Sequence, residues 1–166
     1  MPSENSQKPL IKAFFYGTLK RNEPNFDQLS NLNVTFLSEA VTVDKYPLII
    51  ASDFKIPFML NKKGYGKNVH GELYLIDEEA KKFLDEFEGV HQNLYTDLTI
   101  DVIDKKSNQI HQVCSYLLDN FKEDLLNENT ILFDNYSSKN KYHSEYEKCA
   151  DTPENSQIVY DAVKAS

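Results

Sequence analysis

The sequence predicts an α+β fold organised around a mixed sheet or a small β-barrel. Many short apolar segments with strand-like composition follow one another, and few helices separate them, which is not the pattern of a parallel βαβ fold. One further segment has apolar residues at clear helical spacing. The chain of 166 residues is long enough for one domain with a sizeable core.

The predicted strands are apolar runs that are rich in β-branched and aromatic residues or that alternate strictly. The first run ends at Gly17. Two later runs contain Pro47 and Pro57, and because proline cannot donate to a sheet ladder, these runs are expected to be edge strands or strand entries. The strands are expected at residues 11–16, 34–43, 46–50, 56–60, 69–76, 94–103 and 112–118.

The clearest predicted helix begins after Asp77, a good N-cap residue, and ends at Gly89, the expected terminator. Its apolar residues recur at helical spacing and are Ala80, Phe83, Leu84 and Phe87. Pro24 is well placed in the first turn of a short helix that reaches about residue 32. Past residue 121 the pattern is ambiguous, with weakly amphipathic stretches at residues 125–133 and 139–149.

We expect a single domain over residues 10–150, with a flexible tail at residues 1–9 and a C-terminal extension at residues 151–166. The tail lacks the apolar segment of a secretory signal, and no run of 18 apolar residues predicts a membrane span. The formal charge of −8 argues against nucleic acid or an anionic membrane as a partner. A cytoplasmic monomer is expected.

The cysteines and histidines predict neither a disulfide nor a metal site. Cys114 and Cys149 lie far apart and fit no Cys-x-x-Cys pattern, so both are expected to be reduced thiols. The four histidines show no metal-ligand spacing, and no zinc site is predicted from His70, His91, His111 and His143.

A candidate anion site follows the first predicted strand. The segment Phe-Phe-Tyr-Gly-Thr-Leu at residues 14–19 is an apolar strand that breaks at its glycine, and backbone N–H groups past such a break can hold an anion. Taken alone, the tetrapeptide at residues 16–19 is also typical of a plain strand-to-turn transition. Because no His–Asp pair lies near Thr18, its hydroxyl is expected to cap backbone or contact a substrate and not to act as a nucleophile.

A candidate acid/base lies at the end of the clearest helix. On a wheel of about 100° per residue, Glu88 falls roughly 40° beyond Leu84, at the edge of the apolar face, while Asp85 points away from the core. Burial and the negative end of the helix dipole both disfavour the charged carboxylate, so both raise its pKa toward neutrality. The alternative reading of the spacing is a surface residue that completes a solvated helix end.

Short motifs occur in a characteristic order along residues 11–118. They read Phe-Tyr-Gly-Thr-Leu-Lys-Arg (15–21), Pro-Asn (24–25), Tyr-Pro-Leu-Ile-Ile (46–50), Ile-Pro-Phe-Met-Leu (56–60), Gly-Tyr-Gly (64–66), Val-His-Gly-Glu-Leu-Tyr (69–74) and Leu-Asp-Glu-Phe-Glu-Gly (84–89). This ordered set resembles the γ-glutamylcyclotransferase-like superfamily, and the Tyr-Pro-Leu and Ile-Pro segments are most similar to its γ-glutamylamine cyclotransferase branch. The family opening usually has glycine where Asn22 stands, and asparagine tolerates the left-handed backbone that such a turn needs.

The resemblance implies a small mixed β-barrel-like sheet flanked by short helices, and an enzyme without a cofactor. The reaction would cyclise a γ-glutamyl amide, such as the γ-glutamyl-ε-lysine left from transglutaminase cross-links, to 5-oxoproline and a free amine. By the same resemblance, Glu88 is the catalytic acid/base, and the substrate site is lined by Tyr16, Gly17, Thr18 and Leu19. A segment that closes over the site is expected at Asp134, Asn135 and Tyr136, with Tyr142 after them.

Two other functions stay open at this point. One is cyclotransfer on γ-glutamyl-α-amino acids, and the other is a non-catalytic ligand-binding or interaction protein that kept the pocket. Glu88 counts against the second, because a carboxylate in an apolar pocket costs stability without a role. Four tyrosines are candidates to line the pocket: Tyr65, Tyr95, Tyr136 and Tyr142.

Overall fold

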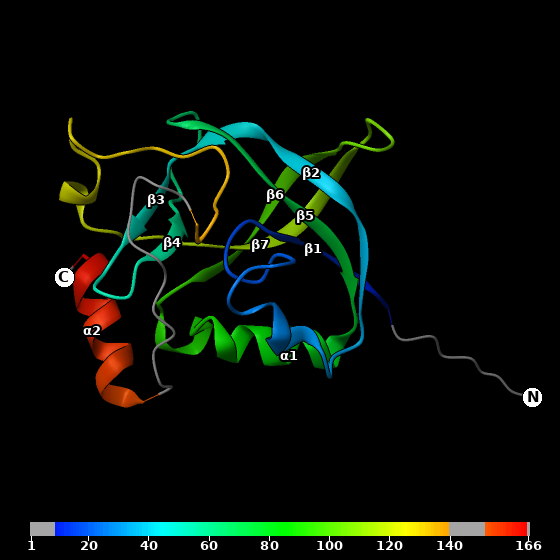
Figure 1. Ribbon diagram of the computed structural model, residues 1–166, viewed down its shortest axis with the longest axis horizontal. Helices are drawn as coiled ribbons and strands as arrows, with labels where there is room; N and C mark the ends of the chain where they lie inside the picture. Colours follow the sequence, from blue (N-terminus) through cyan, green and yellow to red (C-terminus); the bar gives the residue numbers. More distant parts are fainter. Residues whose placement is uncertain (1–8, 140–151, 166) are drawn as a thin grey trace, which may run out of the picture.

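Five strands form a closed barrel, which is the centre of the fold (Figure 1). The computed structural model describes residues 9–139 and 152–165. Neighbouring strands are antiparallel except β1 and β7, whose parallel contact places Ala13 opposite Cys114 and closes the barrel. The barrel strands, in spatial order, are β1 (Ile11–Phe15), β5 (Lys67–Ile76), β2 (Val34–Tyr46), β6 (Thr96–Asp104) and β7 (Ile110–Leu117). The predicted mixed, barrel-like sheet is confirmed.

A separate hairpin lies beside the barrel. It consists of β3 (Leu48–Ala51) and β4 (Ile56–Met59), which pair with each other as a two-stranded sheet. Pro47 directly precedes β3, as expected of a strand entry, and Pro57 stands opposite Ile50 within the hairpin. A single bridge between Leu60 and Leu118 connects the end of β4 to the end of β7. The hairpin is thereby held next to the end of the barrel's last strand.

The last three residues of β1 are buried on both faces of the sheet, which explains why they are all apolar. Phe14 points into an inner core inside the barrel, together with residues such as Leu73 and Ile100. Its neighbours Ala13 and Phe15 belong to an outer core between the sheet and the helices. The Phe-Phe pair of the first strand therefore serves two separate cores.

Helix α1 (Glu78–Phe87) matches its prediction at both ends and lies along one side of the barrel (Figure 1). At its start, the Asp77 carboxylate accepts a hydrogen bond of 2.8 Å from the Ala80 N–H. Ala80 and Leu84 are fully buried in the outer core. At its end, Gly89 takes a left-handed backbone with φ 66°, which glycine adopts without strain. Local sequence signals therefore fix where Glu88 stands.

Two segments differ from the expected pattern. The helix expected after Pro24 is only a 3-10 turn, η1 (Phe26–Leu29), although Asn22 has the left-handed φ of 67° expected for the turn before it. The sequence did not predict α2 (Pro153–Val163), which lies in the expected C-terminal extension and contributes Val159 and Val163 to the outer core.

The remaining turns and chain segments have little regular structure. Short 3-10 turns, η2 (Val90–Gln92) and η3 (Glu123–Leu125), follow α1 and β7. Of the stretch expected at residues 139–149, only Lys139 lies within the described residues, and of the tail at residues 1–9, only Pro9. Cys114 is a free cysteine in β7, whereas Cys149 and His143 lie outside the described residues. In the described part of the chain, no helix combines the length and the apolar character needed to cross a membrane.

Candidate active site

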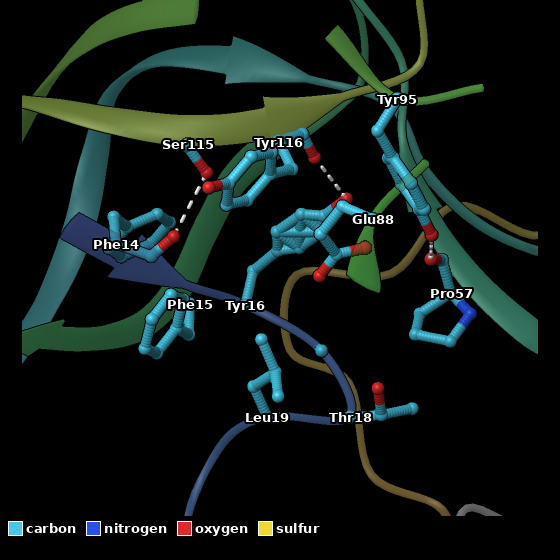
Figure 2. A pocket seen from close by; sticks show the side chains of 11 residues that line it. Phe14, Phe15, Tyr16, Thr18, Leu19, Pro57, Glu88, Tyr95, Ser115 and Tyr116 are labelled. Carbon is cyan, nitrogen blue, oxygen red and sulfur yellow. Dashed lines mark hydrogen bonds between the residues drawn. The ribbon is translucent and has the colours of Figure 1, made fainter. Parts of the chain in front are cut away.

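A small pocket of about 40 Å³ opens where β1 ends (Figure 2). It lies between the end of β1, the end of α1, the β3–β4 hairpin and β7. The five residues to which the family resemblance gives a catalytic or substrate-binding role, Glu88 and residues 16–19, all border it, so one cavity brings together two segments that are far apart in the chain. The bordering residues are Phe14, Phe15, Tyr16, Gly17, Thr18, Leu19, Pro57, Glu88, Tyr95, Ser115 and Tyr116.

Glu88 is the C-cap residue of α1, and its side chain is partly buried. Its N–H donates to the Leu84 carbonyl at 2.8 Å, which continues the helical pattern, and Figure 2 shows its carboxylate directed into the pocket. Within the described residues, this carboxylate has no hydrogen-bond or ion-pair partner. Burial raises the pKa of Glu88 to about 8, the direction that the helical wheel predicted. Both protonation states are therefore accessible near neutral pH, which suits a group that takes up a proton and then donates it.

The turn after β1 leaves backbone donors available at the pocket. The Lys20 N–H donates to the Gly17 carbonyl at 3.1 Å, and the Asn25 N–H donates to the Thr18 carbonyl at 2.9 Å. The N–H groups of Gly17, Thr18 and Leu19 donate to no acceptor within residues 9–139 and 152–165. Successive N–H groups of this kind form an anion-binding concavity.

Gly17 allows the turn to approach the hairpin closely. A Cβ atom at this position would lie 2.9 Å from Cγ of Pro57, which is closer than real Cβ contacts. Pro57 is fixed in turn, because its carbonyl accepts a hydrogen bond of 3.0 Å from the Tyr95 hydroxyl and the Tyr95 ring stacks on Phe58. One wall of the pocket is therefore a tightly packed contact between Gly17, Pro57 and Tyr95.

The Tyr16 hydroxyl is hydrogen-bonded to the backbone of two other strands. It donates to the Tyr116 carbonyl at 2.7 Å and accepts from the Met59 N–H at 3.2 Å. Burial, and to a smaller extent the nearby Glu88 charge, raise the pKa of Tyr16 far above its usual range. Tyr16 thus offers its ring and backbone to the pocket, while its hydroxyl ties β1 to β7 and β4.

Side chains on the far side of the turn hold it in place. The Lys20 ammonium donates to Asn135 Oδ1 and to the Tyr136 carbonyl, both at 2.7 Å, and its burial lowers its pKa. The buried Glu72 carboxylate of β5 accepts from the Arg21 N–H at 2.9 Å and from Arg21 Nε at 3.0 Å. The donors of the turn are therefore presented from a fixed backbone.

The segment expected to close over the site contacts this turn from behind. Asn135 and Tyr136 bind Lys20, and the Tyr136 ring is buried in the inner core. Neither these two residues nor Asp134 border the pocket, and Tyr142 lies outside the described residues. Among the other candidate tyrosines, Tyr95 borders the pocket.

Asp85 differs from its prediction, because its side chain faces the barrel. The Tyr116 hydroxyl donates to Asp85 Oδ1 at 2.7 Å. Lys81 pairs with Asp85 at 2.6 Å and with Asp97 of β6 at 2.8 Å. The helical wheel considers only the apolar residues of α1, whereas β6 and β7 offer polar partners to this flank. We call Lys81, Asp85, Asp97 and Tyr116 the docking cluster, because it fastens the helix that carries Glu88 to the barrel.

Sequence reasoning missed Pro57, Ser115 and Tyr116 as pocket residues. Ser115 and Tyr116 reach the pocket through the parallel contact of β7 with β1, and Pro57 through the hairpin. No local sequence pattern predicts these contacts. The serine within the apolar run at residues 112–118 is the one local feature that could have indicated a pocket residue there.

Comparison with known proteins assigns the family. The profile of the family described as "Gamma-glutamyl cyclotransferase, AIG2-like" matches residues 13–148, which include every residue that borders the pocket. The chain belongs to this family.

Relatives and a solved structure agree with that assignment. Gamma-glutamylaminecyclotransferase C of Danio rerio is 39% identical over 124 residues, which cover 71% of this chain and 82% of the relative. Gamma-glutamylaminecyclotransferase of Rattus norvegicus is 46% identical over 84 residues, or 48% of this chain and 56% of the relative. The crystal structure of an AIG2-like protein from Mus musculus superposes with a TM-score of 0.79 at 28% identity, covering 86% of this chain and 99% of that one. The barrel with two flanking helices is therefore the fold of this family.

Proposed function

We propose that the protein is a γ-glutamylamine cyclotransferase, which converts a γ-glutamyl amine into 5-oxoproline and a free amine. The observation that carries the proposal is that one small pocket joins a carboxylate of raised pKa to backbone N–H groups, none of which has a partner among the described residues. The names of the relatives, gamma-glutamylaminecyclotransferases, support the substrate class. We take γ-glutamyl-ε-lysine, the isopeptide of transglutaminase cross-links, as the representative substrate.

In this proposal, binding curls the glutamyl chain. The N–H groups of Gly17, Thr18 and Leu19 hold the α-carboxylate, and the aromatic walls of the pocket keep water away from the reacting atoms. The substrate's own α-amino group then lies near its γ-carbonyl carbon. Because the nucleophile belongs to the substrate, the protein's main task is positioning, which converts the reaction into a favourable ring closure.

Glu88 moves the protons in this scheme. Its carboxylate takes a proton from the α-ammonium group, and the freed nitrogen attacks the γ-carbonyl carbon to form a tetrahedral intermediate. The protonated Glu88 then donates to the departing nitrogen, and the carbon–nitrogen bond of the amide breaks. Over the whole reaction the attacking nitrogen loses two protons and the departing amine gains both, leaving as an ammonium ion, with Glu88 relaying them one at a time.

The decisive test replaces Glu88→Gln, which keeps the shape of the side chain and removes its acid/base function. We expect turnover of γ-glutamyl-ε-lysine to fall by about a thousandfold, while 5-oxoproline still binds. The control is Glu86→Gln, which changes an exposed glutamate two positions away and should leave turnover intact.

In the wild type, kcat/KM should rise with pH toward about 8, because the ionised form of Glu88 is the base. Normal turnover by the Glu88→Gln variant would contradict the assignment.

The substrate class is tested with the wild-type protein. We expect 5-oxoproline release from γ-glutamyl-ε-lysine and much less from a γ-glutamyl-α-amino acid. Release from the γ-glutamyl-α-amino acid alone would favour the neighbouring cyclotransferase activity, and binding of both without turnover would favour a non-catalytic protein. We also propose a cytoplasmic location and a monomeric state, to be measured by cell fractionation and light scattering.

A further inference from the structure

The pocket must hold its anion without a cation. Five of its bordering side chains carry hydroxyl groups, and among the described residues that border it there is no lysine or arginine. A bound carboxylate therefore depends on neutral donors, namely backbone N–H groups and whichever hydroxyls still have a proton to offer.

Four of the five hydroxyls give their proton to the protein. Each donates to a carbonyl or carboxylate oxygen at 2.7–3.0 Å, and a hydroxyl has only one proton to donate. The pairs are Tyr16 with the Tyr116 carbonyl, Tyr95 with the Pro57 carbonyl, Ser115 with the Phe14 carbonyl, and Tyr116 with Asp85.

The fifth hydroxyl, that of Thr18, accepts a hydrogen bond from the protein instead of donating one. Its oxygen accepts a hydrogen bond of 3.0 Å from the side-chain amide of Asn25, and its proton has no acceptor within the described residues. Figure 2 shows this hydroxyl on the side of the turn that faces the pocket. Asn25 is itself fixed, because it is only 5% exposed and its N–H donates to the Thr18 carbonyl at 2.9 Å.

We propose that Asn25 is a positioning residue that, by donating to Thr18 Oγ1, reserves the Thr18 hydroxyl proton for the substrate's α-carboxylate. This inference rests on the proposed function and deepens it. It adds a side-chain donor to the backbone N–H groups of the turn, and it makes a free carboxylate next to the reacting amine a requirement for tight binding. Ligands that lack this carboxylate gain nothing from the arrangement.

The test measures binding, so it does not depend on turnover. The probes are 5-oxoproline and pyrrolidin-2-one, which has the same ring without the carboxylate, titrated by NMR or calorimetry. We expect Thr18→Val, which removes the hydroxyl at constant shape, to weaken 5-oxoproline binding about 10- to 100-fold. Binding of pyrrolidin-2-one should change by less than about twofold, and Thr18→Ser should retain most of the affinity for 5-oxoproline.

Asn25→Asp tests the role of the amide directly. The new carboxylate keeps the shape of asparagine but accepts the Thr18 proton, so the donor to the ligand is lost. We expect a loss of 5-oxoproline affinity of about tenfold or more in the presence of Thr18. In a Thr18→Val background, most of that loss should disappear, and only the repulsion between the added charge and the ligand should remain.

Three results would overturn the proposal. Additive effects of Asn25→Asp and Thr18→Val would show that the two side chains do not act together. An unchanged affinity in Asn25→Asp would show that the amide oxygen, not the amide nitrogen, faces Thr18. Equal weakening of both probes by Thr18→Val would indicate lost packing. If Asn25→Asp fails to fold, the two Thr18 variants with the two probes still test whether the Thr18 hydroxyl is the donor to the carboxylate that the proposal requires. Failure of the proposed function is a separate result: 5-oxoproline binds as expected, but γ-glutamyl-ε-lysine is not turned over.

Discussion

Glu88 links the chemistry of the pocket to the stability of the fold. Its pKa rises from 4.5 to about 8 on folding, because the folded chain removes the carboxylate from water. Between these values the folded protein holds a proton that the unfolded chain releases. The stability that protonated Glu88 contributes is therefore full below about pH 4.5 and is lost as the pH rises to about 8.

The first prediction follows from this linkage. Glu88→Gln cannot ionise, so relative to the wild type it should become progressively more stable from pH 4.5 to pH 8, with no further gain above. A tenfold change in proton affinity on folding corresponds to about 1.4 kcal/mol, and because the Glu88 side chain is only partly buried we expect a gain of about 2 kcal/mol at pH 8. Urea unfolding at a series of pH values measures the difference, with Glu86→Gln as the reference. A difference that does not vary with pH would mean that Glu88 is well solvated.

The second prediction concerns the close contact between Gly17 and Pro57. Gly17→Ala places a methyl group 2.9 Å from the Pro57 ring, and we expect it to cost about 1–3 kcal/mol in free energy of unfolding and to displace the donors of the turn. Activity should fall more than stability alone would cause. Adding Pro57→Ala should restore part of both by making room. The contact is not the cause if the double variant is no better than Gly17→Ala alone.

Among the secondary-structure elements, α1 has the most direct effect on the proposed function, because its C-cap residue is the proposed acid/base Glu88. Its cap and its glycine terminator fix its length, and the docking cluster fixes how it lies on the barrel. The position of Glu88 therefore depends on polar contacts made one turn and two turns earlier in the same helix.

The third prediction tests this dependence. Tyr116→Phe leaves the ring in place but deprives Asp85 of its hydroxyl donor. We expect a loss of about 1–2 kcal/mol in free energy of unfolding and a lower kcat, because the end of α1 is held less firmly. Tyr65→Phe, which changes a tyrosine that is 40% exposed, serves as the control and should alter neither. Unaltered stability in Tyr116→Phe would show that Lys81 and Asp97 alone keep α1 in place.

The same elements show what the sequence can and cannot predict. The strand before Gly17 and the helix between Asp77 and Gly89 were predicted correctly, because their signals lie within a few residues of each other. The sequence did not predict that Asp85 faces the barrel, because the hydroxyl that binds it belongs to Tyr116 of the distant strand β7. After Pro24 the sequence predicts a helix that reaches about residue 32, whereas the structure has only the 3-10 turn η1. For the pocket, the candidates on β1 and α1 were found locally, whereas Pro57, Ser115 and Tyr116 depend on pairing between distant strands.

One outer core joins α2, near the C-terminal end of the chain, to α1 and β1. Val159 and Val163 are almost completely buried there, although only two of its side chains are so placed and its amphipathic pattern is correspondingly weak. This weak pattern explains why the sequence did not predict the helix.

The fourth prediction concerns this helix. Val163→Ala should lower the free energy of unfolding by about 1–3 kcal/mol, because it leaves a cavity in the outer core. Ile158→Ala, in the same helix and 44% exposed, should change it by less than about 0.5 kcal/mol. Chemical denaturation of the two variants measures both values. Equal effects would mean that α2 does not contribute to the cooperative fold.

The parallel contact between β1 and β7 has a consequence for how the protein is made. Ala13 meets Cys114 only after about a hundred further residues have been synthesised, and contacts between such distant positions form slowly. A nascent chain on the ribosome therefore has the turn at Gly17 and, later, the helix ending at Glu88, but no cavity between them until its last barrel strand has emerged. A translation product that stops before β7 lacks the pocket residues Ser115 and Tyr116, and we expect it to be inactive.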